Sequence, residues 1–404
     1  MQSLALVTGL GIVRIGFVHR HMGIMSRVST NLCLSLLSLF GCLAVGEVFL
    51  RGIGFDFAGE EERAWRQVPI FYRFPMAPSG DIFFKRPGSE QWTGQVLNTQ
   101  LKQLGVLPNP YTKEPVITVS YDRRGFRNPE HMSDWAIAVA GDSFTELGYL
   151  PYEQLFTSIL ANILNVSVLN LGTSFTGPLT QLSYLHDYGI AASTKHTIIV
   201  FFEGNDLKDI GNEYEDLVRW RETGQRYYRE FIKQPSLVRA LYKVVERVWQ
   251  KQPHAVTAYF KSSQGDIPVT LGNAPPGRDQ LSQETMHQLN YFFKQYEDFG
   301  KERQITLWLA YMPGKRRVLH GQIAFTASAT KKLKNWQSGD LPEVISGLCD
   351  QYGIKFIDLT PALIRATSHN KQLMYNSMYD NHLNSHGSLV VGQELARHFS
   401  GQNR

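Results

Sequence analysis

The stretch AVAGDSFTELG, residues 138–148, decides both the fold and the site of this chain of 404 residues. An apolar run ends in Gly-Asp-Ser, and a polar segment compatible with a helix follows at once. This order predicts a buried strand, a tight turn and a helix. Ser143, at the turn, has two interpretations: it is the N-cap of the helix, or it is a nucleophile at the mouth of a site.

Further apolar runs rich in Val, Ile and Phe follow the first, and they have the length of strands that are buried on both faces. Together the runs are WAIAVAGDS (135–143), VSVLNLG (166–172), TIIVFFEGND (197–206), ITLWLAYMP (305–313) and IKFIDLT (354–360). Apolar residues at helical spacing lie between them, within 155–164 and 286–296, and again after Ser385. Strands that alternate with helices predict an α/β fold, a doubly wound parallel sheet with helices on both faces.

The remaining segments divide around this alternation. Residues 135–404 form the predicted α/β domain, and an insertion at about 209–279 interrupts it between the third and fourth strands. Residues 51–134 are aromatic, rich in Pro and irregular, so we expect an extension packed on the domain. A short strand is predicted within it at 116–121.

Basic residues are scattered, and the net charge is only +5, which argues against nucleic acid as a partner. A predicted helix in the insertion carries basic side chains four residues apart, at Arg239, Lys243, Arg247 and Lys251. They indicate a solvated face or, alternatively, a contact with anionic headgroups or acidic glycan. The GKRR sequence at 314–317 is interpreted as a solvated loop, with contact to an anionic substrate as the alternative.

The N-terminal region contains NLCLSLLSLFGCLAVGEVFLR, residues 31–51, in which Glu47 is the only charge before the final arginine. A helix of roughly 20 apolar residues crosses a bilayer, so the sequence predicts a transmembrane anchor at 31–50. Arginines 14, 20 and 27 precede it. By the positive-inside rule, residues 1–30 are cytoplasmic and the chain after the anchor lies across the inner membrane, in the periplasm or outside the cell.

Two alternatives to an uncleaved anchor remain open for this segment. Small residues at Ala44 and Gly46 are compatible with a cleaved signal peptide. The sequence LFGC, residues 39–42, has a weak likeness to a lipoprotein box, although apolar residues continue beyond Cys42.

Polar residues gather where the predicted strands end. In an open α/β sheet the carboxyl ends of the strands converge on one crevice, so we expect these residues to lie close together. The first strand leads to Asp142 and Ser143, the second to Asn170 and Gly172, the third to Gly204, Asn205 and Asp206, and YDNHLNSHG (379–387) supplies Asp380 and His382.

These residue types are the components of acyl transfer. A serine hydroxyl needs a neighbouring base before it attacks an acyl carbon, and histidine is suited to that role. A carboxylate on the other ring nitrogen orients the histidine, and fixed N–H donors stabilise the oxyanion that forms.

Four short blocks carry a resemblance to a known family. They are GDSF (141–144), NLG (170–172), GND (204–206) and DNHLN (380–384), and they occur in this order, each after the expected element. In these blocks the chain resembles the SGNH or GDSL hydrolases over about residues 135–400. The resemblance implies the flavodoxin-like form of the doubly wound sheet. The membrane segment and the extension are similar to those of membrane-attached bacterial members.

By position, the resemblance implies that Ser143 is the nucleophile, that His382 is the base and that Asp380 orients His382. The last block departs from the family in one respect, since its spacing is D-x-H rather than the common D-x-x-H. His386 is an alternative base, although we expect it to be a surface residue without a catalytic role.

The resemblance also implies three oxyanion donors: the Ser143 amide, an amide of the second block at Gly172 and the side chain of Asn205. In the family the second donor often lies a few residues further on, which corresponds to Phe175 or Gly177. Supporting roles at the turns fall to Asp142, Gly204 and Asp206.

The sequence therefore predicts a membrane-anchored serine esterase. Because of the predicted location, an O-acetyl group on a cell-surface or exported polysaccharide is the expected substrate, and this expectation is made by analogy. Two alternatives are an O-acyltransferase that modifies polysaccharide and a glycan-binding or assembly protein without catalytic activity. No metal motif and no Gly-rich phosphate loop occur in the sequence, so neither a metal nor a cofactor is predicted.

Overall fold

The computed structural model describes residues 34–49 except 36, 88–94 except 90, 116–223 except 175, and 256–400 except 272–274, 328 and 378–380. Several predictions lie outside these residues: the cytoplasmic segment 1–30, the helix with the basic stripe, Phe175 and Asp380.

The centre of the domain is a five-stranded sheet in which all neighbouring strands are parallel. The strands are β3 (Ile137–Gly141), β4 (Val168–Asn170), β5 (His196–Phe202), β8 (Thr306–Met312) and β10 (Lys355–Asp358). Four of them fall within one of the predicted runs, and β5 begins one residue before its run, at His196. Their spatial order, β4-β3-β5-β8-β10, is the doubly wound flavodoxin-like order, so the predicted architecture is confirmed.

Successive residues of these strands point to opposite faces, and both faces are buried. In the register of the sheet, Val139 lies opposite Ile198, and Ile198 lies opposite Trp308. These three side chains belong to one apolar cluster, whereas Ala140, Ile199 and Leu309 belong to another on the opposite face. Burial on both sides explains why the strands are continuous apolar runs rather than alternating ones.

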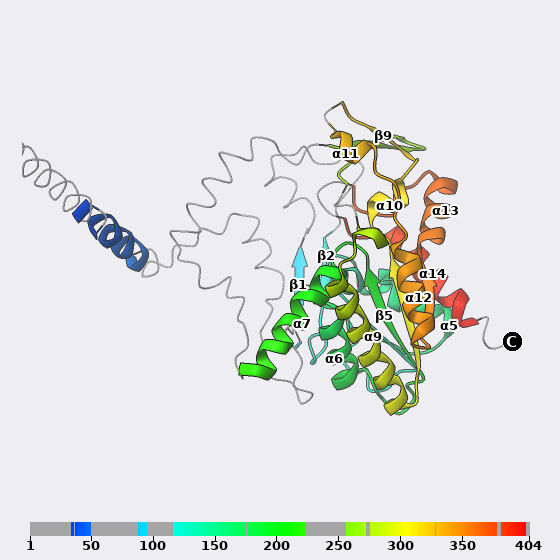
Figure 1. Cartoon of the computed structure of the whole chain (residues 1–404). Coiled ribbons are helices and arrows are strands. Elements are labelled where there is room, and N and C mark those ends of the chain that lie inside the picture. The colour runs from blue at the N-terminus through cyan, green and yellow to red at the C-terminus, as the bar shows by residue number, and fades with distance from the viewer. Residues whose placement is uncertain are drawn as a thin grey trace, which may run out of the picture. The chain divides into compact units, whose positions relative to one another are not determined.

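Helices cover the two faces separately, as Figure 1 shows for α6, α7 and α9 on one side of the sheet and α5, α13 and α14 on the other. The first layer consists of α6 (Pro178–Tyr188), α7 (Asp206–Thr223), α9 (Gln283–Arg303) and α12 (Leu341–Gln351), which contribute to one apolar cluster. The second consists of α5 (Phe156–Leu164), α10 (Lys315–Leu319), α13 (Thr360–Asn370) and α14 (Ser385–Ser400), together with the short α4 (Ser143–Glu146).

Two small antiparallel sheets accompany the main one. Strand β1 (Gln91–Gly94) pairs with β2 (Ile117–Ser120) within the predicted extension. A three-stranded sheet has the order β7-β6-β9, with β6 (Ala258–Ser262), β7 (Gly265–Val269) and β9 (Ile323–Phe325). The short helix α11 (Lys331–Lys334) follows β9, and 3-10 turns occur at Tyr152–Gln154 and Arg278–Gln280.

The predicted insertion begins later than its sequence indicates. Helix α7 follows β5 directly and continues to Thr223, so residues 209–223 belong to the regular alternation of strands and helices. Ile210, Tyr214 and Leu217 turn one face of α7 toward the core, at spacings of four and three residues. The hairpin formed by β6 and β7 is the described remainder of the insertion.

Residues 34–35 and 37–49 are helical within the segment predicted as the membrane anchor. Its large apolar side chains, among them Leu37, Phe40 and Val48, are exposed. Within the part of the chain that the structure describes, no helix is both long enough and apolar enough to cross a membrane.

Candidate active site

Ser143 is the first residue of α4, which follows β3, the strand between β4 and β5 in the sheet. Asp142 is the N-cap of this helix, since its Oδ1 accepts a hydrogen bond from the Phe144 N–H at 2.8 Å. The interpretation of Ser143 as the N-cap is therefore wrong. The tight strand-to-helix turn instead leaves the Ser143 hydroxyl free to face a neighbouring loop.

That neighbouring loop carries His382. Its Nε2 lies 2.6 Å from Ser143 Oγ, which is hydrogen-bonding distance for a nucleophile and its base. The imidazole packs against the Phe144 ring, with 4.7 Å between the ring centroids. Phe144 in turn stacks on Phe202 at the end of β5.

The His382 loop is held by its own backbone. Leu383 forms a β-bridge with Tyr375, and the Asn376 N–H donates to the His382 carbonyl at 2.9 Å. The Tyr149 hydroxyl donates to the Leu383 carbonyl at 2.6 Å. The backbone on both sides of His382 is thus fixed, which is needed for a base to remain aligned with its nucleophile.

Asp380 and His386, the two other residues considered in this region, have different outcomes. Asp380, the predicted orienting carboxylate, lies outside the described residues. His386 is exposed, and its Nε2 lies 2.8 Å from Gln372 Nε2. Of the two histidines, only His382 has a hydrogen bond to Ser143 in this structure.

The third block follows β5 and begins α7. Gly204 is exposed in the turn between β5 and α7. Asp206 Oδ2 accepts a hydrogen bond from the Phe202 N–H at 2.7 Å, and this bond closes the turn. Asn205 is half-buried, and its Nδ2 donates to Asp209 Oδ2 at 2.6 Å. Asp209 therefore fixes the Asn205 amide. This contact was not predicted, because Asp209 falls within the predicted insertion, although the spacing of four residues on one helix indicates such a pair.

Two buried carboxyl groups, those of Asp142 and Asp206, belong to the turns of the first and third blocks. Burial raises the pKa of Asp142 to about 6, against the hydrogen bond from Phe144 and the charge of His382, which lower it. Burial and then the charge of Asp142 raise the pKa of Asp206 well above its ordinary value. Asp206 Oδ1 is buried and has no hydrogen-bond partner among the described residues. A neutral Asp206 fits this environment, because an unpaired charge there is costly.

The second block contributes Asn170 at the end of β4 and Gly172 in the turn. Asn170 Nδ2 donates to the Thr145 carbonyl at 3.0 Å, and its Oδ1 accepts from the Gly172 N–H at 2.7 Å. The Gly172 amide is thus already engaged, which differs from its predicted role as an oxyanion donor. Gly172 is required for close approach instead, since a Cβ there would collide with the backbone of Thr145 and Glu146.

The loop after Gly172 is held by two carboxylates. Glu146 Oε2 accepts from the Ser174 N–H at 2.6 Å, and Glu146 Oε1 accepts from the Tyr121 hydroxyl. Glu213 of α7 accepts from the Gly177 N–H at 2.7 Å and from the Leu179 N–H at 3.0 Å, at the start of α6. The Gly177 amide is therefore also hydrogen-bonded. Neither carboxylate was among the residues predicted from the sequence.

The extension supplies further support for these turns. Arg127 is buried and donates to the carbonyls of Leu147 at 3.0 Å and Leu150 at 2.7 Å, just after α4. Asp122 Oδ1 accepts from the Phe126 N–H at 3.0 Å and closes the turn that leads to Arg127. The described end of the extension is therefore packed on the domain, at the turn that presents Ser143.

The GKRR sequence after β8 is not a solvated loop. Lys315 is only 1% exposed and Arg317 only 5%. Arg317 Nε donates to Glu203 Oε2 at 2.7 Å, and Glu203 also accepts from the Gly314 N–H. Both the solvated interpretation and the anionic-substrate alternative fail for these two side chains, because each is held inside the protein by carbonyl or carboxylate oxygens.

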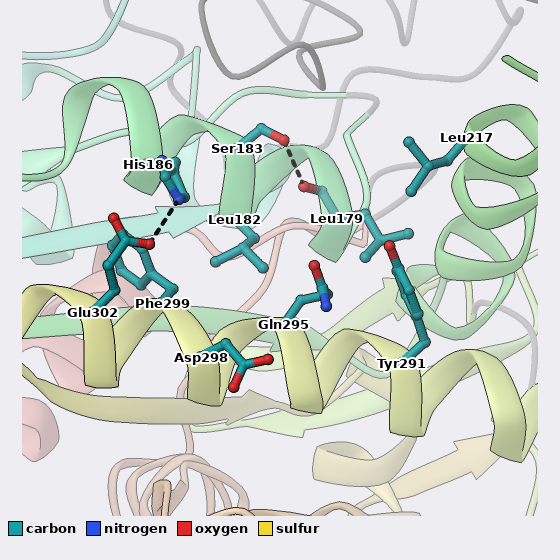
Figure 2. Close-up of a pocket in the computed structure, with 10 residues that line it drawn as sticks. All are labelled: Leu179, Leu182, Ser183, His186, Leu217, Tyr291, Gln295, Asp298, Phe299 and Glu302. Carbon is teal, nitrogen blue, oxygen red and sulfur yellow. Dashed lines mark hydrogen bonds and ion pairs between the residues drawn. The ribbon is translucent and has the colours of Figure 1, made fainter. Parts of the chain in front are cut away.

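A pocket of about 250 Å³ lies on another part of the domain, between α6, α9 and the end of α7. Figure 2 shows Leu179, Leu182 and His186 of α6 facing Tyr291 and Phe299 of α9 across it. Its Ser183 hydroxyl donates to the Leu179 carbonyl at 3.1 Å, within the helix. None of the predicted site residues lines this pocket.

The arrangement at that edge is suited to nucleophilic catalysis. A hydroxyl at hydrogen-bonding distance from an imidazole is activated when the imidazole takes its proton. The Asn205 amide, fixed by Asp209, is a side-chain donor next to the same turn. Among the described residues, no group of three or more His, Cys, Asp or Glu side chains is arranged to hold a metal ion.

No protein-family model matches the sequence, and no curated protein matches it. Solved structures do resemble it. A member of the lipolytic protein G-D-S-L family from Veillonella parvula has 12% identity and a TM-score of 0.34, covering 65% of this chain and 97% of its own. The acetyl xylan esterase AlAXEase has 11% identity and a TM-score of 0.33, and the match covers 65% of this chain and 98% of its own. The lipase/acylhydrolase from Enterococcus faecalis has 11% identity and a TM-score of 0.33, and the match covers 66% of this chain and 95% of its own.

These neighbours are of the kind that the four sequence blocks indicate.

Proposed function

We propose that this protein is a serine esterase of the SGNH type that acts on ester-linked acyl groups. The observation that carries the proposal is the distance of 2.6 Å between His382 Nε2 and Ser143 Oγ at the carboxyl edge of the parallel sheet. Two hydrogen bonds support it, one from the Phe144 N–H to Asp142 and one from the Asn205 amide to Asp209, because they fix the turns of the first and third blocks.

In the proposed reaction, Ser143 Oγ attacks the acyl carbon and His382 Nε2 takes its proton. The bond from the acyl carbon to the alcohol oxygen then breaks, and His382 returns the proton to the departing alcohol. A water molecule next attacks the acyl-enzyme, with His382 as base, and releases the acid and Ser143. The Asn205 amide and the Ser143 N–H stabilise the oxyanion at both stages.

An acetyl group on a carbohydrate hydroxyl is the proposed substrate. The proposal rests on the predicted location, with residues 31–50 as an anchor in the inner membrane and the catalytic domain in the periplasm or outside the cell. Protease treatment of intact cells, of cells with an opened outer membrane and of lysed cells tests the location. We expect the domain to be cleaved before the inner membrane is opened, and cleavage only after lysis would contradict the location.

Hydrolysis of p-nitrophenyl acetate and of an acetylated xylan by the purified protein tests the proposed reaction. We expect turnover by the parent and none above background by Ser143→Ala. Equal rates for the two proteins would reject the esterase and favour a binding role. Acetyl transfer to an added glycan acceptor, in place of acetate release, would identify a transferase with the same acyl-enzyme.

A further inference from the structure

Lys315 is a buried cation that the proposed reaction does not use. It is the first residue of α10, directly after the loop that follows β8, and it is 1% exposed. Its Nζ donates to the Thr270 carbonyl and to the Ser377 carbonyl, each at 3.2 Å. A buried ammonium group is costly unless it is hydrogen-bonded, so these contacts fix the side chain between two segments.

The first of these segments is the end of the hairpin formed by β6 and β7. The hairpin is seated on the chain before His382, because the Thr270 N–H approaches the Ser377 carbonyl at 3.4 Å and the Ser263 N–H approaches the Lys371 carbonyl at 3.3 Å. Phe260 of the hairpin belongs to the same apolar cluster as Leu373. The β6–β7 hairpin and the chain before His382 therefore pack against each other.

The second segment is one arm of the His382 loop. Tyr375 is bridged to Leu383, and the Asn376 N–H donates to the His382 carbonyl at 2.9 Å. Ser377 follows Asn376 directly. A shift of the Ser377 carbonyl therefore also moves the Asn376 N–H, which is hydrogen-bonded to the His382 carbonyl. Such a movement changes the distance from His382 Nε2 to Ser143 Oγ.

We propose that Lys315 is a positioning residue for His382, and that the Thr270 carbonyl, at the end of the β6–β7 hairpin, holds Lys315 in place. The inference rests on the proposed function and gives a role to the hairpin that interrupts the α/β alternation. A misplacement of a catalytic group by about 1 Å lowers a rate by about 100-fold, so a small shift of this loop is sufficient for a large effect.

The test compares Lys315→Met, which removes the charge at similar volume, with Lys315→Arg, which keeps the charge and the donors. Lys261→Met is the matched control, since Lys261 lies on β6 of the same hairpin and its side chain is 62% exposed beside Asp266. The rate at which an alkyl fluorophosphonate labels Ser143 is measured, together with kcat and KM for p-nitrophenyl acetate and the folded fraction by circular dichroism.

We expect labelling of Lys315→Met to fall about 10- to 100-fold, with kcat falling in parallel and KM changing less than about twofold. Lys315→Arg should recover most of the rate, and Lys261→Met should match the parent. Labelling of Lys315→Met at the parent rate would overturn the inference alone. A loss explained entirely by unfolded protein, in Lys315→Met and also in Lys315→Gln, would overturn it too. No adduct on the parent would overturn the proposed function and the inference with it.

Discussion

Asn128 of the extension and Asn170 of β4 exchange two hydrogen bonds. The Asn170 N–H donates to Asn128 Oδ1 at 2.7 Å, and Asn128 Nδ2 donates to the Asn170 carbonyl at 2.9 Å. The Asn128 side chain thus satisfies the backbone of the edge strand β4 as a further strand would. The side chain of Asn170 in turn holds the turns of the first and second blocks.

Replacement of Asn128 by Ala is expected to destabilise the protein. The change leaves the buried N–H and carbonyl of Asn170 without these partners, and one unsatisfied buried group costs about 1–3 kcal/mol. We expect the free energy of unfolding in urea to fall by at least about 2 kcal/mol. Asn335→Ala, at an exposed position after α11, is the control. Equal stability of the two variants would show that the pair contributes nothing.

Glu146 is expected to affect activity through the second-block loop. In Glu146→Ala the Ser174 N–H and the Tyr121 hydroxyl lose a buried acceptor, so the loop beside Ser143 becomes less fixed. We expect both a lower melting temperature and a kcat lowered by about tenfold or more. Glu146→Gln keeps one acceptor and should have a smaller effect. Glu343→Ala on the exposed face of α12 should leave both quantities unchanged.

Asp209 is expected to act on catalysis through Asn205. Loss of one oxyanion donor costs about 100- to 1,000-fold in kcat, which is the expectation for Asn205→Ala. Asp209→Ala keeps the Asn205 amide but removes the hydrogen bond that orients it. We therefore expect a smaller loss of kcat, about tenfold, with little change in KM. Glu215→Gln, which alters an exposed acid on the same helix, is the control. A normal kcat for Asp209→Ala would show that Asn205 needs no such support.

The pH dependence of stability should report on Glu213. Burial raises its pKa to about 7, against the hydrogen bonds from Thr180 and Gly177. The folded protein therefore binds this proton more tightly than the unfolded chain, and its contribution to stability declines as the pH rises from about 4.5 to about 7.

Unfolding of the parent and of Glu213→Gln at several pH values checks this sign. The stability of the parent relative to Glu213→Gln should decrease over this interval and become constant above it. A relative stability that increases with pH would mean that the four donors around Glu213, rather than its burial, dominate its pKa.

The sheet was predictable because short-range patterns encode it, whereas the pairing of Ser143 with His382 was expected from the resemblance that the four blocks carry. Each strand is an apolar run of the right length, and its polar end must lie at the common edge of a parallel sheet. The burial of Lys315 and Arg317 was not predictable in this way. It depends on Glu203 and on the carbonyls of Thr270 and Ser377, which are distant in sequence and come close only in the folded chain.

The boundary of the insertion was misjudged for a related reason. Helix α7 has a mostly polar sequence, so its apolar face at Ile210, Tyr214 and Leu217 is a weak periodic signal. Asp209 and Glu213 lie on this helix, and both were therefore overlooked. The roles of Asn128 and Arg127 depend on which backbone groups the fold leaves unpaired, and local sequence carries little information about that.

The central claim is that His382 activates Ser143, and one measurement tests it most directly. Parent and His382→Ala are treated with an alkyl fluorophosphonate, and the adduct is located and timed by mass spectrometry of peptides. We expect the adduct on Ser143 in the parent and labelling slower by at least about 100-fold in His382→Ala. An adduct elsewhere, or equally fast labelling of the two proteins, would contradict the account.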